Sequence, residues 1–94
     1  MEKEIDRASE PIASVVILTT QSGDWEGMFI DGELISEGHH LGGNNRMFMM
    51  QMGEKYKFTS GMVREKYLDD NDDEMMETRG SFPKNIVDLK GEYI

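Results

Sequence analysis

The chain lacks cysteine and is poor in proline and tryptophan, with two prolines and one tryptophan among 94 residues. Without cysteine, a disulfide framework and a thiolate metal site are both excluded. No apolar run approaches the roughly 20 residues of a membrane-spanning helix. The start of the chain, Met1-Glu2-Lys3-Glu4, is unlike a secretory signal. We therefore expect a cytoplasmic protein with no membrane partner.

Positive charge is also scarce. The chain has 10 lysines and arginines against 19 aspartates and glutamates, which gives a formal net charge of −9. Self-repulsion of this size opposes a compact fold, so we interpret the excess charge as serving contact with a positively charged partner. The same charge disfavours direct binding to nucleic acid or anionic lipid, because both are themselves negative.

The length and a hydrophobic content of 37% fit one small domain with a modest core. Polar residues 1–10 are predicted to be a flexible N-terminus, and residues 11–94 a single domain. The β-branched run 12–20 predicts a central strand that is covered on both faces. Residues 25–30 and 33–37 predict two further strands.

The two later strands are joined by Asp31-Gly32, the pair that a two-residue type I′ hairpin favours. This turn predicts the cross-strand pairs Phe29 with Leu34, Met28 with Ile35, and Glu26 with Glu37. Two carboxylates directly opposite each other cost about a few tenths to 1 kcal/mol. The pair is therefore expected to be relieved by a nearby cation, to lie on a solvated edge, or to belong to an acidic binding face.

A methionine-rich helix is predicted over residues 46–52. Asn44 or Asn45 can cap it, and Gly53 can end it. Its apolar residues leave little polar surface, so we expect it to be buried in the core or against a partner, most simply a second copy in a symmetric dimer. These residues are Met47, Phe48, Met49, Met50 and Met52.

Residues 55–58 and 62–68 each predict a short strand, with a helix as the alternative for most of the second segment. The tail is predicted to turn at Phe82-Pro83 and to dock through Ile86, Val87 and Leu89. The expected architecture is α+β: a small antiparallel sheet with a central hairpin and one or two short covering helices.

The densest negative charge lies in residues 69–77, where six of nine positions are Asp or Glu. Asp70 or Asn71 can cap a short helix that runs to about Thr78 and stops at Gly80. Carboxylates at i, i+3 and i+4 would share one face, with neighbouring Cβ atoms about 5–6 Å apart. Such a row can imitate the phosphates of DNA toward a basic groove, or it can simply be a solvated face. The row consists of Asp70, Asp73, Glu74 and Glu77.

The same run matches a calcium loop only in part. Asp69, Asn71 and Asp73 occupy the first three ligand positions of an EF-hand. The sixth position is Glu74, where glycine is needed, and the twelfth is Gly80, where a bidentate glutamate is needed. We therefore predict no dedicated metal site.

No catalytic constellation is visible, so we expect a protein that is not an enzyme and has no cofactor. His39 and His40 are adjacent, and on a strand they would point to opposite sides. Gly42-Gly43-Asn44-Asn45 lacks the Gly-Lys-Ser/Thr ending of a phosphate loop. An alternative function stays open: a small-ligand module in which the Gly38–Asn45 loop, the histidines and Trp25 line a pocket.

The segment Asp24-Trp25-Glu26-Gly27, followed by Asp31-Gly32, Leu34 and Glu37-Gly38-His39, resembles a pattern of small, mostly uncharacterised bacteriophage and bacterial proteins. The tail Phe82-Pro83-x-Asn85-x-x-Asp88-Leu89 is similar to the end of the same proteins. The methionine-rich middle departs from the pattern, where a more regular acidic helix is usual. The resemblance implies a fold and a phage origin but no activity. In size and charge the chain also resembles a Bacillus phage inhibitor of the histone-like protein HU.

These observations together predict a noncatalytic phage protein of host takeover. It would imitate DNA and inhibit a basic host DNA-binding protein, such as an HU-like nucleoid protein or a transcription component, in the host cytoplasm. Two clusters of carboxylates are predicted to make the contact. The first is Asp69, Asp70, Asp72, Asp73, Glu74 and Glu77, and the second is Glu26, Asp31, Glu33 and Glu37.

Overall fold

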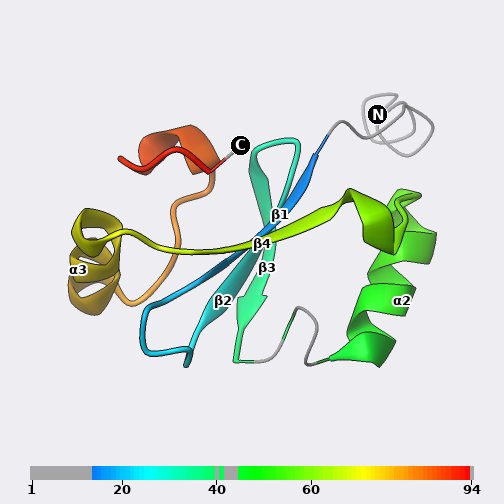
Figure 1. The fold of residues 1–94 in the computed structure, drawn as a ribbon, viewed down its shortest axis with the longest axis horizontal. Coiled ribbons are helices and arrows are strands. Elements are labelled where there is room, and N and C mark those ends of the chain that lie inside the picture. The colour runs from blue at the N-terminus through cyan, green and yellow to red at the C-terminus, as the bar shows by residue number, and fades with distance from the viewer. Residues whose placement is uncertain (1–13, 40, 42–44, 94) are drawn as a thin grey trace.

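The structure, a computed structural model, describes residues 14–39, 41 and 45–93, so the predicted flexible N-terminus lies outside the described residues. The α+β class is confirmed: within these described residues, four strands form one mixed sheet in the order β3-β2-β1-β4, accompanied by two α-helices (Figure 1). The elements are β1 (Val15–Thr19), β2 (Glu26–Ile30), β3 (Glu33–Gly38), α2 (Arg46–Tyr56), η1 (Ser60–Met62), β4 (Val63–Tyr67), α3 (Asp70–Arg79) and η2 (Ile86–Asp88).

Strand β1 lies inside the sheet, and all five of its residues are buried, as its β-branched sequence predicts. It pairs antiparallel with β2 and parallel with β4. β4 therefore departs from the expected antiparallel sheet. Parallel neighbours need a long crossover connection. The chain between β1 and β4 provides one, since it forms the β2–β3 hairpin and then α2 before β4 begins.

Strands β2 and β3 form the predicted hairpin. Asp31 and Gly32 have φ angles of 51° and 88°, the left-handed conformations that a type I′ turn needs. Phe29 lies opposite Leu34 as predicted, but a bulge after Met28 shifts the rest of the ladder by one residue.

The bulge makes the other predicted pairs wrong. The observed pairs are Met28 with Ser36, Gly27 with Glu37 and Glu26 with Gly38, in place of Met28 with Ile35 and Glu26 with Glu37. A shift of one residue sends a side chain to the other face of a sheet. Glu26 and Glu37 therefore lie on opposite faces, and the predicted repulsion between them does not arise.

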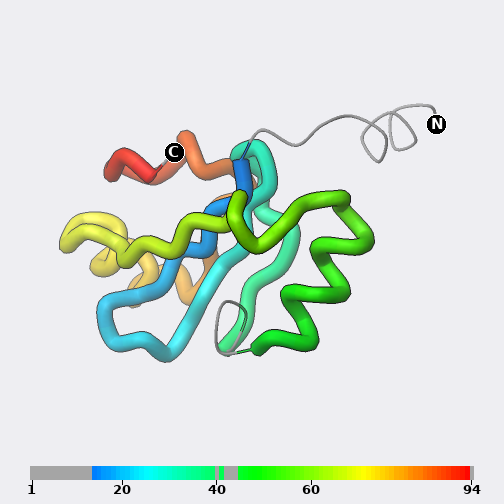
Figure 2. The backbone as a smooth tube through the Cα atoms, turned by 45° about the vertical axis from the view of Figure 1, so that its right-hand side comes forward, coloured from blue at the N-terminus to red at the C-terminus, as the bar shows by residue number. Residues whose placement is uncertain are grey.

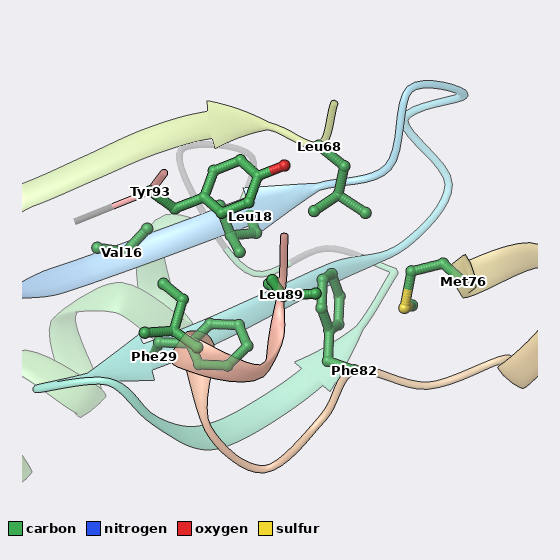
Figure 3. Packing of buried hydrophobic residues seen from close by; sticks show 9 residues of the cluster. Val16, Leu18, Phe29, Leu68, Met76, Phe82, Leu89 and Tyr93 are labelled. Atoms are coloured by element: carbon green, nitrogen blue, oxygen red, sulfur yellow. The ribbon is translucent and has the colours of Figure 1, made fainter. Parts of the chain in front are cut away.

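One face of the sheet is covered by α3 and by the C-terminal segment, residues 82–93. Figure 3 shows side chains of β1 and β2 meeting side chains of this segment. The rings of Phe29 and Phe82 pack edge to face, with centroids 5.7 Å apart. Ile86 and Leu89 are buried here as predicted, whereas Val87 is 73% exposed and does not dock.

The other face of the sheet is covered by α2. Asn45 caps this helix as predicted, its Oδ1 accepting a hydrogen bond from the Phe48 N–H at 3.1 Å. The helix extends past its predicted end to Tyr56, and Lys57 closes it in a left-handed conformation with φ of 64°. No helix in the described ranges is long and apolar enough to cross a membrane.

Gly53 lies inside α2 rather than ending it. A Cβ atom at this position would lie 2.9 Å from the carbonyl oxygen of Phe58. Glycine is therefore needed for a close backbone approach. The strand predicted over residues 55–58 is wrong, because its first half belongs to the helix and the rest forms no strand. The strand predicted over residues 62–68 is confirmed as β4.

Gly27 is a second position of close approach. A Cβ atom there would lie 2.6 Å from the ring of Phe82. We expect Gly27→Ala to lower the free energy of unfolding by about 2 kcal/mol, because overpacking a core costs roughly 1–3 kcal/mol. Urea denaturation measures this loss. Gly61→Ala is the control, since its Cβ would meet no atom closer than 4.0 Å; an equal loss in both variants would contradict the prediction.

Candidate functional site

Helix α3 (Asp70–Arg79) carries the acidic run as predicted, but its cap is Asp69 rather than Asp70 or Asn71. The Asp69 Oδ1 accepts a hydrogen bond from the Asp72 N–H at 2.9 Å. Gly80, with φ of 80°, ends the helix as predicted. Asp70, Asp72 and Asp73 lie in the first turn, where the positive end of the helix dipole favours negative charge.

Asp72 is turned into the protein and is only 2% exposed. Its Oδ1 accepts from the Lys90 N–H, and its Oδ2 accepts from the Gly91 N–H and the Tyr93 hydroxyl, each at 2.9 Å. Burial alone would raise the pKa of Asp72, but the hydrogen bonds lower it below its usual 3.8. Burial and the nearby Asp72 carboxylate raise the pKa of Tyr93 above its ordinary value. Asp72 therefore fastens the C-terminal segment to α3 and is not available to a partner.

Asp70 and Asp73 hold the β1–β2 turn against α3. The backbone N–H of Gln21 donates to Asp73 Oδ1, and the side-chain amide of Gln21 donates to Asp70 Oδ1, both at 2.8 Å. The same amide also donates to the Leu68 carbonyl at 3.2 Å. Asp70 is nevertheless exposed and Asp73 half-buried, so both keep part of their charge at the surface.

Glu74 and Glu77 are exposed, and they complete the predicted row with Asp70 and Asp73. Among the described residues, no lysine or arginine forms an ion pair with these four carboxylates. Like charges at i, i+3 and i+4 on one helix repel each other. The row therefore concentrates negative potential that no cation of the described residues neutralises by an ion pair. We call Asp70, Asp73, Glu74 and Glu77 the α3 row.

The second predicted cluster does not form. Glu26 is buried on the α2 side, where it accepts from the Leu41 N–H at 2.7 Å and from the Thr19 hydroxyl at 3.5 Å. Glu37 accepts from the Trp25 indole N–H at 2.9 Å and from the Phe82 N–H at 3.0 Å. These two carboxylates serve the fold.

The other two members of that cluster lie at the β2–β3 turn. Asp31 is exposed, and its Oδ1 accepts from the Ser14 N–H at 2.9 Å. Glu33 is exposed at the start of β3, beside a bridge to Asn85. Figure 1 shows this turn away from α3, so neither residue extends the α3 row.

A groove of about 260 Å³ lies where the β1–β2 turn meets α3. Three carboxylates line it, Asp24, Asp73 and Glu77, together with Trp25 and Met76. We call it the acidic groove. An aromatic ring beside carboxylates suits an organic cation such as a lysine or arginine side chain. Sequence reasoning missed Asp24 because only the fold brings it to a helix about fifty positions further along.

The histidine loop is described only in part. The His39 Nδ1–H donates to the Asp24 carbonyl at 2.8 Å, and its ring meets Trp25 edge-on with centroids 4.9 Å apart. His40 and residues 42–44 lie outside the described residues, so the proposed ligand pocket there is not outlined. Over the ranges that the structure describes, no group of three or more His, Asp or Glu side chains is arranged to hold a metal ion.

Comparison of the chain with models of protein families, with curated proteins and with solved structures found no match. The functional argument therefore depends on the geometry and charge of α3 and its groove.

Proposed function

We propose that this protein is a noncatalytic acidic inhibitor that occupies the DNA-binding surface of a basic protein, with an HU-like nucleoid protein as the first candidate and a transcription component as the second. The observation that carries the proposal is the α3 row, whose carboxylates are not paired with cations of the chain's own described residues. The resemblance to bacteriophage proteins favours a host protein as the partner and the bacterial cytoplasm as the place of action.

The α3 row supports the proposal through the spacing of its carboxylates and through the electrostatic attraction of a basic partner. Its carboxylates recur at i, i+3 and i+4, with Cβ atoms roughly 5–6 Å apart. A concentrated field of one sign raises the rate of encounter with an oppositely charged surface, and salt screens this effect over about 8–10 Å. Binding should therefore be fast and strongly dependent on salt.

The acidic groove supports a specific form of contact. A lysine or arginine of the partner would enter it, with its charge near Asp73 and Glu77 and its stem along Trp25. This contact differs from general attraction because it desolvates a cation at one defined place. The proposed contact surface therefore consists of the α3 row and the acidic groove. The proposal does not require Glu26, Asp31, Glu33 or Glu37 of the hairpin to contact the partner.

Titration with a purified HU-type protein tests the proposal. Trp25 is the chain's one tryptophan and lines the acidic groove, so its fluorescence reports occupancy. We expect saturable binding at about 0.1 M salt, large weakening at about 0.5 M, and displacement of DNA from the basic protein. The double variant Glu74→Gln/Glu77→Gln should raise Kd roughly tenfold, because it removes two charges from the row and no hydrogen bond that these side chains make.

Glu65→Gln/Glu92→Gln is the matched control. Both residues are exposed, and they lie on β4 and in the C-terminal segment rather than on α3. This variant has the same net charge as the α3 variant, and we expect it to change Kd by less than about twofold. Equal weakening by both variants would show that only net charge matters. Absence of binding at either salt concentration, to HU and to any basic DNA-binding protein captured from a lysate, would refute the proposal.

A further inference from the structure

The outer side of α2 carries apolar side chains that the rest of the described residues do not cover. Its inner side packs half-buried against the sheet through Phe48, Met49, Met52 and Tyr56. On the outer side, Met47 and Met50 are 68% and 70% exposed. Single exposed apolar residues are ordinary, but Met50 also lines a groove of about 390 Å³, together with Met49, Gly53, Glu54, Phe58 and Ser60.

α2 belongs to the least acidic stretch of the chain, which continues through β4. Residues 46–67 contain five cations and two carboxylates, a local net charge of +3 within a chain of −9. Figure 1 and Figure 2 show α2 and α3 at opposite ends of the molecule. Among two-fold arrangements, in which like ends must meet, contact between α2 ends costs less than contact between α3 ends, because the α3 ends concentrate the negative charge. The charged residues are Arg46, Lys55, Lys57, Arg64 and Lys66 against Glu54 and Glu65.

We propose that α2 is the interface of a symmetric dimer, in which the α2 helices of two copies pack antiparallel across a two-fold axis. A two-fold interface needs a surface that complements itself. α2 provides an apolar knob, Met47, and one wall of an apolar groove, which Met50 lines together with Phe58 from the segment after the helix. In the antiparallel arrangement the knob of each copy faces the groove of the other.

The charges of α2 fit this arrangement and not the parallel one. Arg46 begins the helix and Glu54 lies two turns further on, and both are exposed. Antiparallel packing brings Arg46 of each copy to Glu54 of the other, so the dimer contains two identical ion pairs. Parallel packing would place Arg46 against Arg46 and Glu54 against Glu54.

The edge strand β4 offers an alternative dimer interface, but a less favourable one. The Leu68 N–H bonds to the Thr19 carbonyl of β1, so by alternation the backbone groups of Val63, Glu65 and Tyr67 point away from β1. Antiparallel self-pairing centred on Glu65 would set Glu65 against Glu65 and Arg64 against Lys66. Like charges directly opposite destabilise a ladder, which leaves α2 as the favoured surface.

The interface is short, because an 11-residue helix extends roughly 16 Å at about 1.5 Å per residue. We therefore expect a Kd in the micromolar range. Added salt should strengthen the dimer, because it screens the repulsion between two chains of −9 more than it weakens two surface ion pairs. This salt dependence is opposite to that expected for the basic partner, so the two proposals fail independently.

Sedimentation equilibrium of the full chain, from about 1 μM to about 1 mM, tests the dimer. The mass should rise with concentration from 10.8 kDa toward twice that value. Met47→Gln/Met50→Gln should raise the dimer Kd at least about tenfold. Val87→Gln is the matched control, because Val87 is 73% exposed but lies in the C-terminal segment, and it should leave Kd unchanged.

Charge reversal tests the orientation. Arg46→Glu and Glu54→Arg should each weaken the dimer about tenfold, because each replaces two attractive contacts with two repulsive ones. The variant that carries both changes should recover the original Kd, and a mixture of the two single variants should form heterodimers. A chain that stays monomeric throughout, a dimer unaffected by the methionine variant, or a double reversal that fails to recover binding would each overturn the proposal.

Discussion

Replacing Asp72 with asparagine is expected to lower the free energy of unfolding by about 3 kcal/mol. Asp72 accepts three hydrogen bonds through its two carboxylate oxygens, from Lys90, Gly91 and Tyr93. Asparagine keeps the shape but turns one oxygen into an N–H₂ donor. That donor must then face another donor in a buried place, which costs more than the loss of a bond alone. The change is large beside a total stability on the order of 5–15 kcal/mol.

The same carboxylate predicts a loss of stability in acid. The pKa of Asp72 is lowered in the folded protein relative to its usual 3.8. A carboxyl with a lowered folded-state pKa contributes stability above the unfolded-state pKa, and this contribution disappears as the pH falls through the folded-state value. We therefore expect Asp72→Asn to be much less stable than the natural chain at about pH 7, and the difference to shrink below about pH 4.

Urea denaturation followed by Trp25 fluorescence and circular dichroism, at several pH values, measures both effects. Tyr93→Phe is an informative second variant, because the Tyr93 hydroxyl donates to Asp72 and also accepts from the Asp69 N–H at 2.7 Å. The free energy of unfolding of Tyr93→Phe should be lower than that of the natural chain by about 1–2 kcal/mol. Glu92→Gln changes an exposed neighbour and should stay within about 0.5 kcal/mol of the natural chain. If Asp72→Asn kept its full deficit at low pH, the pKa argument would be wrong.

The parts of the fold that sequence predicted depend on short-range signals. A β-branched run predicts β1, Asp31-Gly32 predicts the hairpin turn, and Gly80 predicts the end of α3. In each case the residue that decides the conformation lies within a few positions of the structure it determines. The acidic helix was predicted for the same reason, from first-turn carboxylates and Gly80, although its cap is Asp69 rather than Asp70 or Asn71.

The parts that sequence could not predict depend on partners far along the chain. In the sequence, Asp72 looks like one more surface carboxylate. Only the fold brings residues 90–93 back to α3, where Asp72 is buried and accepts their hydrogen bonds. The bulge in the hairpin is equally invisible, although it brings Glu37 to the N–H groups of Trp25 and Phe82. Of the ten predicted site residues, Asp69, Asp72, Glu26 and Glu37 therefore have a role in the fold, and the exposed side of α3 remains the candidate.

Phe82→Ala is expected to lower the free energy of unfolding by about 4 kcal/mol, the largest effect of a single substitution that we predict. Phe82 is 3% exposed and packs edge to face on Phe29 in the core beneath the C-terminal segment (Figure 3). Alanine would leave a cavity against the sheet, and the close-packed strands β1 and β2 cannot move to fill it. Val87→Ala is the control within the same segment, since Val87 is exposed, and it should change the free energy of unfolding by less than about 0.5 kcal/mol.

The strongest check on this packing combines Phe82→Ala with Gly27→Ala. The added methyl group at Gly27 would clash with the Phe82 ring at 2.6 Å, but in the double variant it points into the space that the ring has left. The double variant should therefore be more stable than the sum of the single losses predicts, with a coupling on the order of 1–2 kcal/mol. Strictly additive losses would show that the ring does not rest on Gly27, and that the C-terminal segment covers the sheet in another way.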